Sequence, residues 1–171
     1  MKKLIIALAV GIPVLLAYAN GQGVTKAELV EYYRKVAEEY RKAAEQGNAE
    51  AQYNLGACYE HGRGVTKDLA EAVKWYRKAA EQGHASAQLG LGGCYSCGHG
   101  VTKDQAEGIY WYRKAADQGN ATAQHILGMH YHFGGGATKN NRAEAVKWYR
   151  KAAKQGYKNA QKALIRMGES W

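Results

Sequence analysis

The sequence predicts an all-α protein, an α-solenoid of stacked helix-turn-helix repeats of about 36 residues each. One segment, YRKAAEQG or a close variant of it, begins at Tyr40, Tyr76, Tyr112 and Tyr149, so that its copies start 36, 36 and 37 residues apart. Repeat periods of roughly 20 to 50 residues are typical of solenoids, in which each unit buries its apolar flanks against its neighbours. Apolar residues within each repeat follow helical spacing, which agrees with this class.

The first 19 residues are typical of a secretory leader. Lys2 and Lys3 precede an apolar run that ends in the small-x-small sequence Ala-Tyr-Ala at 17–19, a pattern that signal peptidases cut. The run is shorter than the ~20 apolar residues that a membrane-spanning helix needs. We therefore expect residues 1–19 to be a signal peptide, with an uncleaved anchor as the alternative. The mature protein is then periplasmic or secreted, with no stable membrane span.

The rest of the chain divides into three full repeats between two partial ones. Within a repeat, Ala51, Leu55 and Tyr59 mark the apolar face of a first helix, and a second helix follows. Terminal units of solenoids are expected to differ from internal ones. The predicted parts are an N-terminal half-repeat with a capping helix at 20–47, repeat 1 at 48–83, repeat 2 at 84–119, repeat 3 at 120–156 and a C-terminal capping helix at 157–171.

Caps and glycines mark the ends of the helices. Each second helix is preceded by an N-cap acceptor with glutamate three residues on, the capping-box pattern, at Asp68, Asp104 and Asn141. Each is followed by a glycine suited to the left-handed C′ position, at Gly83, Gly119 and Gly156. A glycine inside a helix costs ~1 kcal/mol relative to alanine, which predicts close approach of neighbouring helices at three positions. These are Gly56, Gly92 and Gly128.

Three motifs recur at fixed spacing: AxAQxxLGxxY from Ala49, GxGVxKD from Gly62 and AxxWYxKAAxQG from Ala72. Together they resemble the Sel-one-like repeat (SLR) family of the tetratricopeptide-like superfamily, over nearly all of residues 21–168. The resemblance implies a right-handed superhelix that acts as a non-enzymatic adaptor, often in exported bacterial proteins that bind other proteins or cell-wall material. Some secreted, cysteine-rich relatives are associated with β-lactam binding or hydrolysis, but this sequence lacks their regular pair of cysteines in each unit.

The resemblance also implies a concave groove lined by the first helices. Positions that flank the Leu-Gly pair vary from repeat to repeat, whereas packing positions such as Leu55 and Trp75 hardly change. We expect a protein or peptide to bind at the variable positions, with drift at unconstrained surface sites as the alternative. They are Tyr53, Asn54, Ala57, His61, Leu89, Gly90, Gly93, Cys97, His125, Ile126, Met129 and Phe133.

The cysteines allow several interpretations. Cys94 and Cys97 lie one helical turn apart, with Cβ atoms ~5–6 Å from each other, so a disulfide or dithiol is predicted there if the helix end distorts. Cys58 is expected to be reduced and buried. Zinc bound by Cys58, His61, Cys94 and Cys97 is the less favoured alternative, because Cys58 falls in a core column. We expect no metal and no cofactor.

No phosphate-binding loop, catalytic triad or paired carboxylates stand out in the sequence, so we expect no enzymatic activity. The alternative function is a small secreted hydrolase, similar to a β-lactamase, or a thiol-redox protein that uses Cys94 and Cys97.

Positive charge is concentrated in the second half of the chain. From His84 to Trp171 there are twelve Lys or Arg residues against five Asp or Glu, whereas residues 20–83 contain ten of each. This asymmetry predicts a basic end that could bind an anionic envelope component, with a merely solvated face as the alternative. Nucleic acid is not an expected partner of an exported protein. The predicted basic patch consists of Lys147, Lys151, Lys154, Lys158 and Lys162.

Overall fold

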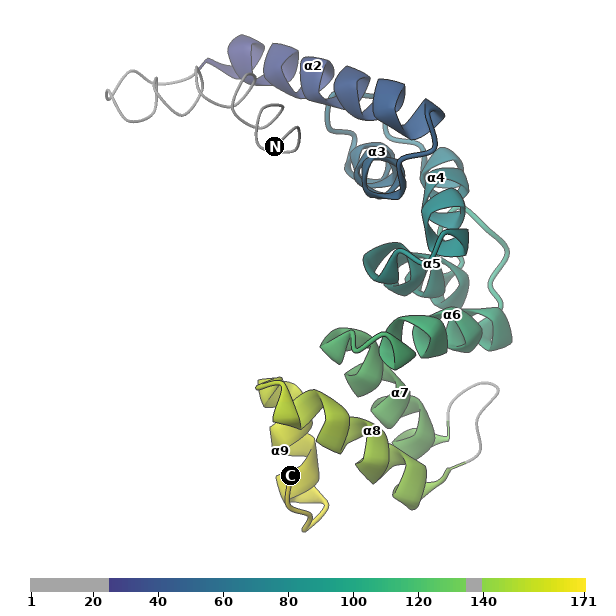
Figure 1. The fold of residues 1–171 in the computed structure, drawn as a ribbon, viewed down its shortest axis with the longest axis vertical. Coiled ribbons are helices and arrows are strands. Elements are labelled where there is room, and N and C mark those ends of the chain that lie inside the picture. Colours follow the sequence, from purple (N-terminus) through teal and green to yellow (C-terminus); the bar gives the residue numbers. More distant parts are fainter. Residues whose placement is uncertain (1–24, 135–139) are drawn as a thin grey trace. The chain divides into compact units, whose positions relative to one another are not determined.

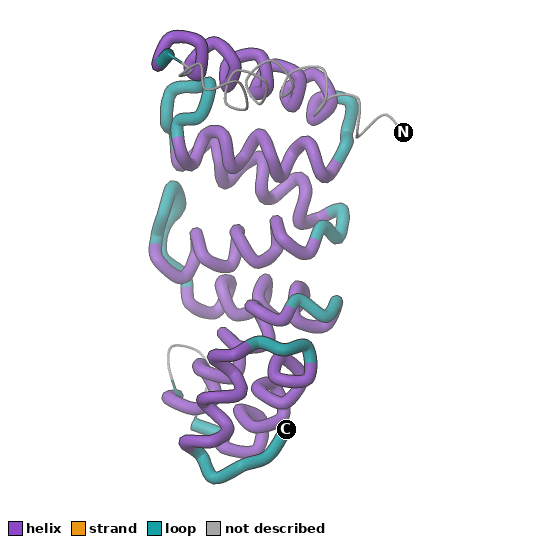
Figure 2. Tube along the Cα trace, turned by 90° about the vertical axis from the view of Figure 1, so that its left-hand side faces the viewer, coloured by secondary structure: helices purple, strands orange, loops and turns teal. Residues whose placement is uncertain are grey.

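The fold is entirely helical in the part of the chain that the computed structural model describes, residues 25–134 and 140–171 (Figures 1 and 2). Its helices, joined by short loops, are α2 (Lys26–Glu45), α3 (Ala49–His61), α4 (Leu69–Glu81), α5 (Ala85–Cys97), α6 (Gln105–Asp117), α7 (Ala121–Phe133), α8 (Arg142–Lys154) and α9 (Lys158–Arg166). The all-α prediction is confirmed. No helix among these is both long and apolar enough to span a membrane. The predicted signal peptide, residues 1–19, lies outside the described residues.

The chain divides into two compact units, one up to Trp75 and one from Tyr76 onward. In the first unit, α2 packs against α3. Ala44, Ala51, Leu55 and Trp75 form the core of this unit. The helix α2 is 20 residues long and begins at a capping box in which Thr25 and Glu28 satisfy each other's backbone amides. It lies within the segment 20–47, for which the sequence predicts an N-terminal capping helix.

In the second unit, each helix from α5 to α9 packs against the next, and α7 also contacts α9. Leu91, Leu127 and Leu164, which occupy equivalent positions in α5, α7 and α9, are all fully buried. Trp148 of repeat 3 packs in the same cluster as Ile109 and other residues of repeat 2. Neighbouring hairpins therefore share one core, as the solenoid prediction requires.

The glycines inside α5 and α7 are confirmed as places of close approach. A Cβ at Gly128 would lie 2.5 Å from the ring of Tyr149, and a Cβ at Gly92 would lie 2.7 Å from the ring of Tyr112. Contact distances this short do not occur in folded proteins without a shift of the neighbour. The space that these glycines leave is therefore filled by a tyrosine ring from the second helix of the same repeat.

The predicted N-caps of the second helices are present, but all three glutamates that follow them have other partners. Glu71, which follows Asp68, pairs with Lys74 at 2.8 Å. The Asn141 side chain accepts the amide of Glu144 at 3.1 Å, as predicted. The Glu144 carboxylate pairs with Lys147 at 3.3 Å. Glu107 instead accepts the indole N–H of Trp111 at 2.8 Å. The N-cap side chain is therefore enough to begin these helices without the reciprocal bond from the glutamate, and the glutamates bond to other side chains of their own helices.

Buried glutamines join successive repeats through hydrogen bonds. Gln124 is 4% exposed, and its Nε2 donates to the carbonyl of Ala116 at 3.0 Å. Its Oε1 accepts from Nε2 of Gln155 at 2.8 Å. One repeat earlier, Gln88 donates to the carbonyl of Ala80 and accepts from Gln118 in the same way. These bonds fix how each first helix sits against its neighbours, which explains the glutamine of the AxAQ motif.

Candidate functional site

The predicted groove residues are all accessible in their own helices. Each of the twelve is half-buried or exposed, whereas the neighbouring Leu55, Leu91 and Leu127 are completely buried. Accessibility increases toward the end of α7, where Met129 is 37% exposed and Phe133 is 73% exposed. A single exposed apolar side chain is common on protein surfaces, but Phe133 and Met129 are both exposed and line one pocket, which makes this end of α7 a candidate contact site.

The repeat positions of the predicted groove residues continue into α9, a feature that the sequence analysis did not use. We call each set of equivalent repeat positions a column. Aligning Leu127 with Leu164 places Lys162 at the position of His125, Ala163 at that of Ile126, and Arg166 at that of Met129. The repeat alignment could have revealed this, because α9 begins with the same Ala-Gln pair as the other first helices. The predicted binding face therefore gains a fourth helix that carries two cations.

These columns meet at a pocket of about 430 Å³ in the second unit, which we call the α7–α9 pocket. Its volume lies within the range of ~300–1,000 Å³ typical of ligand pockets. The residues that line it come from α7, α8 and α9 and are His125, Met129, His132, Phe133, Tyr149, Asn159, Lys162, Ala163 and Arg166. Three predicted groove residues, His125, Met129 and Phe133, are thus brought together. Ile126 is half-buried against the core instead.

Aromatic rings form one wall of the α7–α9 pocket. The ring centroid of His125 lies 5.6 Å from that of Tyr149 and 5.1 Å from that of Tyr157. The rings of His132 and Phe133 stack at 4.5 Å. Burial lowers the pKa of His125 and raises the pKa of Tyr149 to about 12. At neutral pH this wall is therefore uncharged at the half-buried His125 and at Tyr149, which is only 1% exposed.

Two cations stand opposite this wall without a carboxylate partner. Lys162 and Arg166 are exposed, and neither forms an ion pair within the described residues. The segments outside those residues, 1–24 and 135–139, contain no Asp or Glu that could pair with them. The one acidic residue that follows α8, Glu169, is held by Arg142 at 3.3 Å and Arg150 at 2.9 Å. The positive charge of the pocket is thus uncompensated.

The predicted basic patch is divided between different surroundings. Lys147 pairs with Glu144 at 3.3 Å, and Lys151 lies over the ring of Trp148 at 4.1 Å. Lys154 and Lys158 are exposed. Lys162 lines the α7–α9 pocket. The binding of an anionic envelope component to these lysines stays a prediction.

Cys58, Cys94 and Cys97 form no disulfide in the structure, so the Cys94–Cys97 pair has the dithiol form of the two that were predicted. The helix α5 remains regular up to Cys97 and is capped by Gly98 in the left-handed conformation, with its amide donating to the Cys94 carbonyl. This geometry keeps residues one turn apart too distant to be bridged. Cys58 is buried, and that burial raises the pKa of its thiol although Arg63 opposes the shift. Within the described residues, no three His, Cys, Asp or Glu side chains gather as a metal site.

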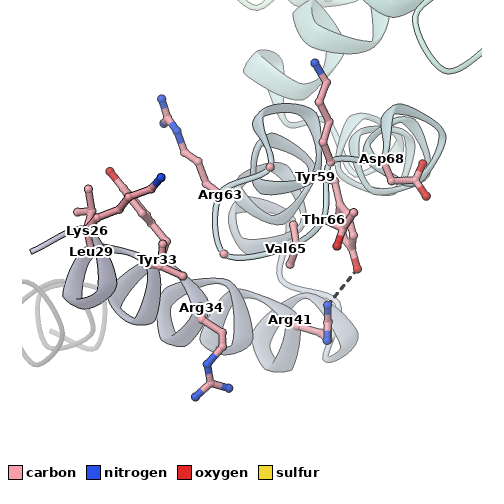
Figure 3. A pocket seen from close by; sticks show the side chains of 14 residues that line it. Lys26, Leu29, Tyr33, Arg34, Arg41, Tyr59, Arg63, Val65, Thr66 and Asp68 are labelled. Carbon is pink, nitrogen blue, oxygen red and sulfur yellow. Dashed lines mark hydrogen bonds between the residues drawn. The ribbon is translucent and has the colours of Figure 1, made fainter.

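A second hollow, of about 950 Å³, lies in the first unit between α2 and the loop that follows α3 (Figure 3). None of the predicted groove residues lines it. At one end, Nη2 of Arg41 donates to the hydroxyl of Tyr59 at 3.0 Å. Arg34 and Arg63 extend in opposite directions, so the cations of this hollow do not converge on one point (Figure 3). Among these cations, Arg34 is already paired with Glu31 at 2.8 Å.

Comparison with known proteins finds one family. The sequence matches the model of the Sel1 repeat at residues 7–29, 40–48, 49–84, 85–120 and 121–157. The first of these matches overlaps the predicted signal peptide. No curated protein matches the sequence.

Several solved structures are similar to the chain. A protective antigen of uropathogenic Escherichia coli strains, described as displaying an SLR fold, is 43% identical, with a TM-score of 0.73 over 89% of this chain and 31% of that one. A Sel1 repeat protein from Oxalobacter formigenes is 38% identical, with a TM-score of 0.72 over 87% of this chain and 58% of that one. Cysteine rich protein B of Helicobacter pylori is 27% identical, with a TM-score of 0.52 over 74% and 91%. The chain thus spans less than two thirds of the first two proteins.

Proposed function

The chain belongs to the Sel1 repeat family, and from that premise we propose that it is an exported, non-enzymatic scaffold that binds a protein or peptide through the groove face of its first helices. Proteins of this family bind other proteins and generally act as interaction scaffolds. The observation that carries the proposal is the α7–α9 pocket, where three predicted groove residues lie together beside two unpaired cations. We take this pocket as the centre of the binding face.

The composition of the pocket supports binding rather than catalysis. It combines exposed apolar side chains, Met129 and Phe133, with polar groups at its edge, which is the usual make-up of a recognition site. A thiol-redox function requires an accessible cysteine pair, usually at a helix N-terminus. Cys94 is buried, and both Cys94 and Cys97 lie at the C-terminal end of α5. The described residues therefore favour the scaffold over the redox alternative.

Site-specific photo-crosslinking tests the proposed binding face. A photo-reactive phenylalanine analogue placed at Met129, which lines the α7–α9 pocket, should crosslink a discrete protein partner in cells that express the full chain. The matched control carries the same analogue at Asp117, which is exposed at the end of α6 and outside the pocket. Equal capture at both positions, or none at either, would contradict the proposal.

Export is the part of the proposal that rests on sequence alone. The leader-like pattern of residues 1–19 supports it. Sequencing of the N-terminus of protein recovered from the periplasm or medium should give Asn20 as the first residue. Full-length protein confined to the cytoplasmic fraction would rule out the exported form.

A further inference from the structure

We propose that the α7–α9 pocket binds a peptide segment in which a carboxylate lies next to a large apolar side chain. This inference rests on the proposed function, because it specifies which partner sequence the scaffold recognises. Two features of the pocket carry it, a pair of unpaired cations and an exposed aromatic wall.

The cations are placed to act on one anion. Lys162 and Arg166 are four residues apart on α9, a spacing that puts two side chains on the same face of a helix. Both line the same pocket, and neither has an acidic partner within the described residues. A guanidinium binds a carboxylate through two parallel hydrogen bonds, and an ammonium adds a third donor. An incoming carboxylate would therefore find compensation that the chain itself does not provide.

The wall of the pocket explains why an apolar neighbour is needed. Phe133 is 73% exposed and Met129 is 37% exposed, and both line the pocket on the α7 side. Covering apolar surface of this kind is favourable, by roughly 25 cal/mol per Å² removed from water. A ligand that carried only a charge would leave Phe133 in water. A carboxylate close to an aromatic or aliphatic side chain would contact α7 and α9 together.

The other basic residues near this end do not make an equivalent site. Lys147 is paired with Glu144, and Lys151 is stacked over Trp148. Arg142 and Arg150 already share Glu169. Carboxylate recognition is therefore assigned to Lys162 and Arg166, and a substitution at Lys154 and Lys158 provides a control of equal charge that lies outside the pocket.

The first measurement is a selection of random heptapeptides displayed on phage, with the full chain as bait. Enriched peptides should contain Asp, Glu or a C-terminal carboxylate within two residues of Phe, Tyr, Trp, Leu, Ile or Met. Synthetic copies with a fluorophore are then titrated by anisotropy against wild type, K162Q/R166Q, the control K154Q/K158Q, and F133A. The removal of both pocket cations should weaken binding at least about tenfold, and the control pair less than about twofold.

F133A should also weaken binding several-fold, and an amide in place of the peptide carboxylate should reproduce the effect of K162Q/R166Q on wild type. Far-ultraviolet circular dichroism with thermal melting checks that each variant is folded, which is expected because all five side chains are exposed.

Four outcomes would overturn the inference. Selected peptides without acidic groups, or acidic peptides that bind K162Q/R166Q as well as wild type, would refute carboxylate recognition but leave a peptide-binding scaffold in place. The absence of any selected peptide, together with the absence of a crosslinked partner at Met129, would refute the proposed function itself. Liposomes containing phosphatidylglycerol that bind wild type but not K162Q/R166Q, without peptide selection, would assign the cations to lipid phosphate.

Discussion

The helices α7 and α9 start alike and end differently. In both, an alanine, a glutamine and a leucine open the helix, and Leu127 and Leu164 are fully buried. The next residue is Gly128 in α7, against which Tyr149 packs, but Ile165 in α9, which is 61% exposed. The residues by which a first helix packs against the preceding repeat are therefore retained in α9. The residue that would pack against a second helix of the same repeat has changed.

The end of each helix shows the same contrast. Tyr131 of α7 accepts a hydrogen bond from Arg113 of the preceding helix. The equivalent position after α9 is Gly168, and Arg150 donates instead to Glu169 at 2.9 Å and to the Ser170 carbonyl at 2.8 Å. An arginine contact is preserved, but its acceptor is replaced by residues beyond the helix. The terminal helix is thus held by a different set of polar contacts.

The largest expected difference in the free energy of unfolding is between substitutions at Gly128 and at Ile165. Gly128→Val would place a branched side chain against the Tyr149 ring and should lower the free energy of unfolding by about 3 kcal/mol, the upper range for overpacking. Ile165→Val, a change in the equivalent column of α9, should cost less than about 0.5 kcal/mol because the side chain is exposed. Urea denaturation followed by circular dichroism measures both. Similar losses for the two variants would show that the column is packed equally in α7 and α9.

The glutamines should show a smaller difference in the same direction. Gln124→Leu removes a buried hydrogen bond to Ala116 and a part-buried one from Gln155, and should lower the free energy of unfolding by about 2 kcal/mol. Gln161→Leu in α9 removes a bond to the Ala153 carbonyl from a part-buried side chain and should cost about 1 kcal/mol. The same denaturation measurement applies. A larger loss at Gln161 would reverse the comparison.

Glu169 provides a still smaller, salt-dependent effect. Glu169→Gln weakens two ion pairs, with Arg142 and Arg150, and should cost about 1 kcal/mol or less at low salt. Glu144→Gln, which affects a single exposed pair within one turn of α8, should cost about 0.3–0.5 kcal/mol. Both losses should shrink when the denaturation is repeated at 1 M salt, because ions screen exposed charges. A Glu169 effect that is unchanged by salt would point to packing instead of charge.

Most of the fold could be predicted from the sequence because its signals are local and repeated. The spacing of the YRKAA segments sets the repeat length, and residues such as Asn141 and Gly156 mark helix ends by backbone chemistry that needs no tertiary context. The partners of Glu107 and Glu144 were not predicted, because a glutamate at this position can bond either to the N-cap amide or to a side chain of its own helix. Here Glu107 bonds to Trp111 and Glu144 to Lys147. The glutamine bonds were missed because they are tertiary contacts, which join Gln124 to Ala116 eight positions away and to Gln155 31 positions away.

The candidate site was predicted only in part. His125, Met129 and Phe133 were selected because their columns vary between repeats, and they do line the α7–α9 pocket. Lys162 and Arg166 follow soon after the lysines of α8, and for that reason they were read as part of a basic end. The repeat alignment, which places them in the predicted groove positions, was not applied to α9. The other nine predicted groove residues do not line this pocket, and a binding role for all twelve stays a prediction.

The smallest expected effect concerns His125, which occupies in α7 the column that Lys162 occupies in α9. Burial lowers the pKa of His125 below its usual value near 6.5. Between the lowered pKa of the folded state and the usual pKa near 6.5, the unfolded chain binds the proton more readily than the folded protein does. The contribution of His125 to stability is therefore complete above about pH 6.5, and it is lost as the pH falls through the pKa of the folded state. His125→Asn should flatten that part of the dependence of unfolding free energy on pH. Lys162→Gln should leave the pKa of His125 unchanged in an NMR titration, because burial and not a neighbouring charge causes the shift. A pKa for His125 at or above 6.5 in the folded protein would show that this side chain is more solvated than its contacts with Tyr149 and Tyr157 indicate. A pKa that rises with Lys162→Gln would show that His125 is electrostatically coupled to α9.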